Sequence, residues 1–222
     1  MSSLSYFNQV ATQWDNLRQS FFSDAVRDKA LDAAQVQSGA LAADLGAGSG
    51  FITEGLVARG VRVIAVDQSD AMLHVMSAKF ADEKFADRAA IEFRRGDADT
   101  LPIADGECDY VFANMYLHHT ADPAHAIAEM ARVLKPNGVV VITDADAHNF
   151  EFLREEQHDR WLGFARADIH KWFEQAGLRN IEVRDAEEKC CSTSNCETTR
   201  AEINIFLARA FKAQEKTAPS VE

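Results

Sequence analysis

The chain has 222 residues, of which 47% are hydrophobic and 26% charged, and its formal net charge is −12. This length suffices for one domain with a full hydrophobic core. An acidic chain offers no basic stripe to neutralise phosphates, so its charge argues against a nucleic-acid partner and against an anionic membrane surface.

The chain start and the cysteines bear on where the protein works. The first six residues have neither the basic nor the apolar region of a signal peptide, and no apolar run is long enough to cross a membrane. We therefore expect a cytoplasmic protein without membrane association. In that setting the four cysteines are expected to be reduced thiols rather than a disulfide framework.

Residues 4–36 are predicted to be helical, because apolar side chains from Phe21 onward recur at helical spacing. Ahead of them lie three large aromatic residues, Tyr6, Phe7 and Trp14. These aromatics either pack on the core or form a lid over a ligand site, and the sequence leaves both interpretations open.

A glycine-rich loop follows the first predicted strand. The apolar run at 41–45 gives way to Gly46, Gly48 and Gly50, and a helix is predicted over 53–59. Glycines let the chain turn sharply and let a ligand approach the backbone closely. The helix N-terminus adds free N–H groups and a partial positive charge. The loop therefore suits an anionic or carboxylate-bearing ligand.

Strands and helices alternate along the rest of the chain. A β-branched run at 61–66 predicts a second strand ending at Asp67, and Ser69 or Asp70 can cap the helix that follows, to about residue 81. The remaining predicted elements are strands at 90–94 and 108–113, a helix opened by Asp122-Pro123, a turn at 135–138, a strand at 139–143, a helical region at 150–161, a helix capped by Asp168 and ended by Gly177, and strands at 180–184 and 202–207.

This alternation predicts an α/β fold, a doubly wound and mostly parallel sheet of seven strands with helices on both faces. The last two strands have no helix between them, so they can only pair as an antiparallel hairpin. Ligands of such sheets bind outside the carboxyl ends of the strands. We expect residues 1–212 to form a single domain with residues 1–36 as a helical lid, followed by a disordered tail at 213–222.

Acidic residues at the strand ends narrow the choice of ligand. The glycine pattern is G-x-G-x-G, because Phe51 occupies the last glycine position of the dinucleotide fingerprint G-x-G-x-x-G. This favours S-adenosylmethionine over a nicotinamide cofactor. Asp67 is placed to accept both ribose hydroxyls. Asp97 is placed to accept a hydrogen bond from the adenine amine, with the Ala98 N–H nearby. Asn114 and Met115 end the fourth strand, beside the methionyl part of the cofactor.

The chain resembles the class I S-adenosylmethionine-dependent methyltransferases of the ubiquinone-biosynthesis-like group over residues 5–211. The segments that carry the resemblance are Asp44-Leu-Gly-Ala-Gly-Ser-Gly50, Val66-Asp67-Gln-Ser, Gly96-Asp97-Ala98 with Leu101-Pro102, Asn114-Met-Tyr-Leu-His-His119 and Val133-Leu-Lys-Pro-Asn-Gly138. The resemblance implies the strand order 3-2-1-4-5-7-6 with strand 7 antiparallel. It also implies methyl transfer, with S-adenosylhomocysteine as product. We expect a small-molecule acceptor and a monomer or homodimer.

In that family the glycine loop holds the methionyl carboxylate, and the acids matching Asp67 and Asp97 hold the ribose and the adenine amine. Met72 matches an apolar residue that packs on the adenine. We therefore expect cofactor contacts from Tyr6, Trp14, Asp44, Gly46, Ala47, Gly48, Gly50, Asp67, Gln68, Met72, Asp97, Ala98, Asn114, Met115 and His119.

A narrower similarity concerns the acceptor. Trp14-Asp-Asn-Leu-Arg18 and the segments at 147–156 and 161–164 resemble methyltransferase domains fused to arsenic-responsive repressors, and methyltransferases associated with corrinoid proteins. Arsenite and a corrinoid-associated acceptor are therefore alternative substrates. A non-catalytic module that binds S-adenosylmethionine or a thiophilic metal is an alternative function, and a nicotinamide oxidoreductase is a third that Phe51 disfavours.

Three residues are the candidate catalytic groups. Methyl transfer from a sulfonium is an in-line displacement, which needs alignment of the reactants and a general base only when the acceptor loses a proton. His118 and His119 follow the fourth strand, and Asp144 ends the fifth, so all three face the predicted crevice. The histidines could instead bond backbone carbonyls, and Asp144 could cap a helix.

Cys190, Cys191 and Cys196 are expected in the loop of the last hairpin, near the acceptor. Three clustered thiols could bind a soft ion. Their spacing, C-C-x-x-x-x-C, is not a paired C-x-x-C zinc arrangement, so ordinary loop cysteines are the other interpretation. No other metal site is predicted.

Overall fold

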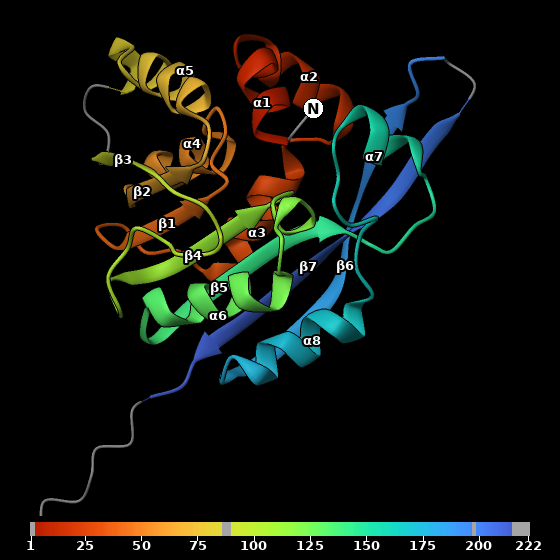
Figure 1. The fold of residues 1–222 in the computed structure, drawn as a ribbon. Coiled ribbons are helices and arrows are strands. Elements are labelled where there is room, and N and C mark those ends of the chain that lie inside the picture. The colour runs from red at the N-terminus through yellow and green to blue at the C-terminus, as the bar shows by residue number, and fades with distance from the viewer. Residues whose placement is uncertain (1–2, 86–89, 197–198, 215–222) are drawn as a thin grey trace, which may run out of the picture.

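The computed structural model describes residues 3–85, 90–196 and 199–214, and a seven-stranded sheet forms its centre (Figure 1). The strand order is β3-β2-β1-β4-β5-β7-β6, and β7 alone runs antiparallel to its neighbours. The predicted sheet is thereby confirmed. The strands are β1 (Leu41–Leu45), β2 (Arg62–Asp67), β3 (Ile91–Arg95), β4 (Cys108–Asn114), β5 (Leu134–Ala145), β6 (Leu178–Thr193) and β7 (Arg200–Lys212).

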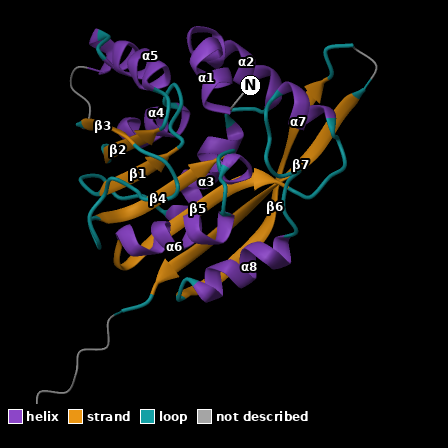
Figure 2. Ribbon diagram, viewed as in Figure 1, coloured by secondary structure: helices purple, strands orange, loops and turns teal. Residues whose placement is uncertain are grey.

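Helices cover both faces of the sheet (Figure 2). Successive strand residues bury their side chains on opposite faces: Ile64 packs in the core beneath α6 and α8, and Val63 in the core beneath α3, α4 and α5. The helices are α1 (Ser3–Val10), α2 (Trp14–Phe21), α3 (Ala25–Ala34), α4 (Phe51–Ala58), α5 (Asp70–Phe80), α6 (Pro123–Val133), α7 (Phe152–Glu156) and α8 (Arg166–Gln175), with short 3-10 turns η1 (Ala11–Gln13), η2 (Glu83–Phe85) and η3 (Leu117–His119).

The N-terminal segment is not the continuous helix predicted for residues 4–36. The chain is extended at Phe22 (φ −154°, ψ 158°), which separates α2 from α3. The Phe22 ring is buried edge-on against Phe51, with centroids 5.6 Å apart, and this tertiary contact favours the extended conformation over helix continuation. As a result α3 packs on the sheet, whereas α1 and α2 contact α5 and β6.

Three elements of the second half have bounds that differ from the prediction. The helical region expected at 150–161 contracts to α7, so residues 157–165 form a loop. α8 begins at Arg166, which places Asp168 inside its first turn rather than at the cap. The turn expected at 135–138 is an irregularity within β5, where the register against β4 shifts.

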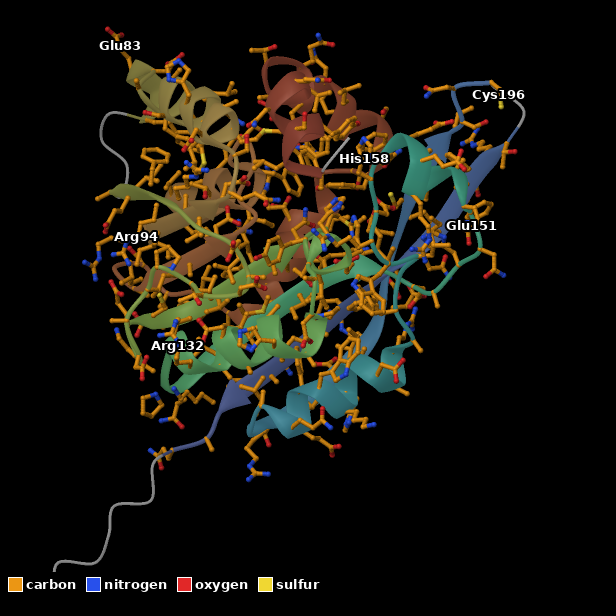
Figure 3. All side chains as sticks on the ribbon, in the orientation of Figure 1. Glu83, Arg94, Arg132, Glu151, His158 and Cys196 are labelled. Atoms are coloured by element: carbon orange, nitrogen blue, oxygen red, sulfur yellow. The ribbon has the colours of Figure 1, made fainter. Side chains whose placement is uncertain are left out.

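β6 is much longer than the strand predicted at 180–184. It continues past an irregularity between Asp185 and Lys189 and pairs again with β7. Cys190 and Cys191 therefore lie in a strand and not in the expected loop. Only Cys196 lies in the connection to β7, at the outer end of the hairpin (Figure 3).

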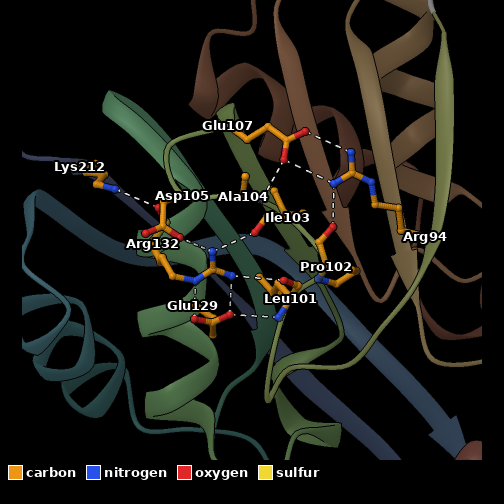
Figure 4. A network of polar contacts seen from close by, with 10 residues as sticks. All are labelled: Arg94, Leu101, Pro102, Ile103, Ala104, Asp105, Glu107, Glu129, Arg132 and Lys212. Atoms are coloured by element: carbon orange, nitrogen blue, oxygen red, sulfur yellow. Dashed lines mark hydrogen bonds and ion pairs between the residues drawn. The ribbon is translucent and has the colours of Figure 1, made fainter.

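Two arginines hold the loop between β3 and β4, which carries Asp97 (Figure 4). Arg94 donates through Nη1 to the Pro102 carbonyl oxygen at 2.7 Å, and Arg132 of α6 donates to the Ile103 carbonyl oxygen at 2.9 Å. These carbonyl groups have no strand partner, so the guanidinium groups satisfy them. The loop is thus fastened to the edge of the sheet.

Throughout the described part of the chain, every helix is too short or too polar to span a bilayer. The tail predicted to be disordered, residues 213–222, lies outside the described residues except for Ala213 and Gln214.

Candidate active site

A cavity of about 180 Å³ lies at the carboxyl edge of β1, β2 and β4, where ligands of such sheets bind. The glycine loop, the ends of β2 and β4, the loop after β3 and the N-terminal helices form its wall. The predicted cofactor residues that line it are Trp14, Asp44, Gly46, Ala47, Gly48, Asp67, Gln68, Met72, Asp97, Ala98, Asn114, Met115 and His119.

The glycine loop is fixed by its neighbours. Gly46 has a φ of +63°, and a Cβ at this position would overlap the Tyr116 ring. Asp67 accepts the Gly48 N–H at 2.8 Å through Oδ2 and the Ser69 N–H at 2.8 Å through Oδ1. Burial raises the pKa of Asp67, and these backbone bonds oppose the shift. The carboxylate therefore joins the loop to α5 and keeps lone pairs for ligand hydroxyls.

Asp44 supports the loop from below. It is 2% exposed and accepts hydrogen bonds from the Thr53 N–H at 3.0 Å and the Thr53 hydroxyl at 2.7 Å. Desolvation raises the pKa of Asp44 to about 7, and the charge of Asp67 acts in the same direction. Asp44 thus ties β1 to the first turn of α4, beside the positive end of that helix.

The residues expected at the adenine all line the cavity. Met72 and Ala98 are buried and give apolar side chains to its wall. Asp97 is exposed, and its Oδ1 accepts the Asp99 N–H at 3.1 Å. Its second carboxylate oxygen has capacity for a further donor, such as an amine.

Arg18 of α2 lines the cavity, and the sequence predicts no role for it. Its guanidinium carbon lies 4.1 Å from the centroid of the Phe51 ring. Nη2 is 3.1 Å from Asp24, whereas Nε and Nη1 are buried and have no hydrogen-bond partner. A buried cation with unpaired donors is costly in isolation, and an anionic ligand group would satisfy it.

Two predicted contact residues lie outside the cavity wall. Gly50 is the N-cap of α4, where a Cβ would come within 2.6 Å of the Phe80 ring. Tyr6 packs on Phe7 and His158, with ring centroids 5.3 and 5.4 Å away. Gly50 therefore shapes the loop, and Tyr6 supports Phe7, which does line the cavity.

His119 is the predicted catalytic residue that the structure places on the cavity wall. Its ring packs edge-on against Phe7 at 5.1 Å, and its Nδ1 is buried without a partner. Burial, together with the charge of His118, holds the pKa of His119 well below 6.5. The imidazole is therefore neutral and able to accept a proton.

His118 and Asp144 lie behind His119. His118 lines a second, smaller cavity of about 30 Å³ together with Asp159 and Cys190. Asp144 is fully buried, and its Oδ1 accepts His118 Nδ1–H at 2.6 Å. Desolvation lowers the pKa of His118, but the charges of Asp144 and Asp159 outweigh it and raise the pKa to about 9. This pair can position His119 but does not reach the larger cavity.

The three clustered cysteines lie in different surroundings. Cys190 and Cys191 are neighbours on β6, so their side chains point to opposite faces of the sheet. Cys190 lines the smaller cavity, and burial raises its pKa to about 12. Cys196 is exposed at the outer end of the hairpin (Figure 3). The arrangement does not gather the thiols around one ion.

Other residues line the larger cavity without a predicted contact. They are Phe7, Phe22, Phe51, Ile52, Gly96, Asp99, Tyr116, Thr120, Ala121 and Arg160. A sequence signal exists for Arg18, because it follows Trp14 by four residues and so shares its helix face. Arg160 has no such signal, since it lies in the loop after α7.

Comparison with known proteins adds independent evidence. A family model described as a methyltransferase domain matches residues 43–142. Demethylmenaquinone methyltransferase of Staphylococcus carnosus is 28% identical over 210 residues, which cover 80% of this chain and 85% of that protein. The demethylmenaquinone methyltransferase of Thermobifida fusca is 36% identical over 138 residues, covering 62% of this chain and 55% of that protein. The chain spans about half the length of several curated relatives that it matches.

Solved structures share the fold. A chain from the complex of the Haloferax volcanii Trm112 methyltransferase activator with a methyltransferase gives a TM-score of 0.76 at 21% identity, covering 98% of this chain and 100% of that chain. Phosphoethanolamine N-methyltransferase 2 of Haemonchus contortus, in complex with S-adenosyl-L-methionine, gives 0.68 at 20% identity, covering 85% of this chain and 52% of that chain.

Proposed function

We propose that this chain carries a methyltransferase domain of the class I, S-adenosylmethionine-dependent family, in the ubiquinone- and menaquinone-like group, and that it methylates a small-molecule acceptor. S-adenosylmethionine supplies an activated methyl group on its sulfonium. The larger cavity, at the carboxyl edge of β1, β2 and β4, is the proposed binding site.

One observation carries this proposal: Arg18 presents unpaired, buried guanidinium donors in the same cavity as the glycine loop. A methionyl carboxylate would satisfy them, because bonds between a guanidinium and a carboxylate are charge-assisted and often bidentate. The N-terminus of α4 adds a favourable dipole on the same side.

The remaining roles follow from position around the cavity. Asp67 is the proposed acceptor for the ribose hydroxyls, since it ends β2 and faces the cavity while holding Gly48. Met72 is proposed to pack on the adenine, and Asp97 to accept a hydrogen bond from its amine. His119 is on the acceptor side, where its neutral imidazole can take a proton if the acceptor loses one.

We propose that the N-terminal helices form a lid within one domain spanning residues 1–212. Trp14 Nε1 lies 3.4 Å from the Cβ position of Gly48, so α2 closes over the glycine loop. Ser69 donates its hydroxyl to Asn8 at 2.7 Å, and Lys79 lies 3.3 Å from Asp15, which fastens the helices to α5 and its cap. A closed lid excludes water from the reacting groups.

Calorimetric titration with S-adenosylmethionine and S-adenosylhomocysteine tests the donor site. We expect saturable binding of both, weakened about 10–100-fold in Asp67→Asn, the loss expected for a hydrogen bond to a charged group. Asp70→Asn is the matched control, because that carboxylate is exposed, pairs with Arg95 at 3.0 Å and is not among the residues that line the cavity. Absence of binding, or an equal loss in both variants, would contradict the assignment.

Methyl transfer is tested by a screen of acceptors that includes quinols, thiols, arsenite and a corrinoid protein, with release of S-adenosylhomocysteine as the readout. Turnover with an acceptor supports the enzyme. Binding of the donor without turnover on any acceptor would instead indicate a non-catalytic binding module.

A further inference from the structure

Three side chains between the two cavities converge on one point. His118 and His119 come from η3, and Asp159 comes from the loop after α7. Each offers one donor atom, and these atoms all lie within 4.8 Å of one another, with His118 Nε2 and Asp159 Oδ1 3.7 Å apart. Within residues 3–85, 90–196 and 199–214, this is the group of histidine, cysteine and acidic side chains that is close enough to share an ion.

The hydrogen bonds behind His118 prepare its ring for ligation. His118 Nδ1–H donates to Asp144, which is fully buried and also accepts the Leu117 and Ala145 N–H groups at 2.9 and 2.8 Å. The carboxylate is therefore fixed by backbone donors and in turn fixes the imidazole, with Nε2 directed at Asp159. A buried carboxylate bonded to the far nitrogen of a histidine is the usual support of a metal ligand.

His119 contributes an independent observation. Its Nδ1 is buried and has no hydrogen-bond partner in the structure. Buried polar atoms are nearly always satisfied by protein, water or an ion, so the unpaired ring nitrogen of His119 indicates a binding partner that is absent from the protein itself. Its ring lies against that of His118, with centroids 4.1 Å apart.

The backbone holds the two segments in place. The His118 carbonyl oxygen accepts the Arg160 N–H at 3.0 Å and the Trp161 N–H at 3.1 Å, and the Trp161 indole N–H donates to the Thr120 carbonyl oxygen at 3.0 Å. Asp159 directly precedes these anchoring residues, and its side chain is 9% exposed. The donors are therefore pre-positioned rather than scattered on a mobile surface.

We propose that His118, His119 and Asp159 bind one divalent first-row transition-metal ion. Two imidazoles and one carboxylate suit Zn²⁺, Fe²⁺ or Co²⁺, whereas Mg²⁺ and Ca²⁺ prefer oxygen donors. Ligand atoms at about 2.1 Å from a metal lie roughly 3.0–3.5 Å from each other, so a pair of donor atoms at the 4.8 Å limit would approach by about 1.3–1.8 Å on binding.

The position gives such an ion access to both cavities. His119 lines the larger cavity, and His118 and Asp159 line the smaller. Three protein ligands leave at least one coordination position for water or for an oxygen or sulfur atom of a bound molecule. The inference stands on the donor geometry and does not require methyl transfer.

Titration of the chelator-treated full chain with Co²⁺ tests the site by calorimetry and by the visible absorption of bound Co²⁺. We expect one ion per chain. Loss of a carboxylate that holds a ligating histidine costs about 10–100-fold in metal affinity, so Asp144→Asn should weaken binding to that extent. Loss of a ligand in Asp159→Asn or His119→Gln should weaken it by about 100-fold or more.

His148→Gln is the matched control, because His148 lines the smaller cavity but is not one of the three donors. It should keep the wild-type affinity. Circular dichroism verifies that each variant is folded. Paramagnetic broadening of the His118 and His119 ring signals by Co²⁺ in the wild-type chain, with His125 and His170 unaffected, provides a measurement that needs no variant.

The proposal is overturned if the wild-type chain binds no Co²⁺. It is also overturned if Asp159→Asn and His119→Gln both keep the affinity, if His148→Gln loses as much as they do, or if broadening spares His118 and His119.

Discussion

Met115 lines both cavities, and the proposed metal-binding group of His118, His119 and Asp159 lies between them. The wall of the larger cavity is formed by residues at or after the ends of β1, β2, β3 and β4, together with the N-terminal helices. The second group joins η3 to a loop about 40 residues further along the chain. One region is built by the ends of neighbouring strands, and the other by the meeting of two distant loops.

The two regions also differ in how their charges are satisfied. In the larger cavity Arg18 keeps two unpaired donor nitrogens, and the exposed carboxylate of Asp97 can accept a further hydrogen bond. In the second group Asp144 and His118 satisfy each other, and Nδ1 of His119 is the orphan. Open polar groups around a cavity indicate a ligand with several functional groups, whereas a single converging point indicates a compact one.

Among the substitutions that should affect one region and not the other, Gly46→Ala is expected to have the largest effect. The substitution forces alanine into a left-handed conformation, which costs about 1–2 kcal/mol, and drives its Cβ into the Tyr116 ring, which costs about 1–3 kcal/mol more. We expect urea denaturation to show this loss and calorimetry to show no S-adenosylmethionine binding, while Co²⁺ binding at the second group persists.

Gly106→Ala controls for the backbone conformation. Gly106 has the same φ of +63°, but the nearest atom to its Cβ position is the Leu134 carbonyl oxygen at 3.9 Å. Gly106→Ala should lower the unfolding free energy only by the cost of the left-handed conformation, about 1–2 kcal/mol. Equal destabilisation by the two substitutions would mean that the Tyr116 contact does not shape the loop.

A second prediction concerns pH and Asp44. Burial raises the pKa of Asp44 from 3.8 to about 7 on folding. Between pH 4 and pH 7 the folded chain therefore keeps a proton on Asp44 that the unfolded chain has lost. The contribution of Asp44 to stability is therefore present below pH 4 and lost as pH rises to 7. Asp44→Asn cannot titrate, so its unfolding free energy should rise relative to wild type by up to about 4 kcal/mol across this window.

Urea denaturation at several pH values measures that difference, and above pH 8 the difference should be constant. A difference that does not change between pH 4 and pH 7 would show that Asp44 is ionised in the folded chain, as it is in the unfolded one.

The sequence predicts the two regions unequally, for physical reasons. Gly46, Asp67 and Asp97 sit within a few residues of strand ends, so the local pattern locates them once the sheet order is known. Arg18 reaches the cavity because the chain is extended at Phe22, and Asp159 reaches η3 because α7 is short. Both depend on tertiary packing, which hydrophobic periodicity does not report.

The cysteines illustrate the same limit. Their expected place in a loop assumed that β6 ends near residue 184, but pairing with β7 resumes beyond an irregularity and carries Cys190 into the sheet. A strand interrupted in this way has no continuous alternating pattern, so sequence alone underestimates its length.

The smallest expected effects lie at the end of that hairpin. Because Cys196 is exposed, Cys196→Ser should change the unfolding free energy by less than about 0.5 kcal/mol. In the folded chain an alkylating reagent should modify Cys196 before Cys108 and Cys190, because burial raises the pKa of both those thiols to about 12. Mass spectrometry of timed samples measures the order, and similar rates at all three sites would contradict the structure.

The assignment of the larger cavity is tested most directly at Arg18 with two ligands. S-adenosylhomocysteine has the amino-acid carboxylate, and 5′-methylthioadenosine lacks it. Arg18→Gln should lower the affinity for S-adenosylhomocysteine about 10–100-fold, the contribution of a hydrogen bond to a charged group. It should leave the affinity for 5′-methylthioadenosine unchanged. Arg27→Gln is the control, because Arg27 also lies over the Phe51 ring, at 5.2 Å, but outside the cavity wall. An Arg18→Gln variant that binds both ligands as tightly as wild type, or loses both equally, would contradict the account.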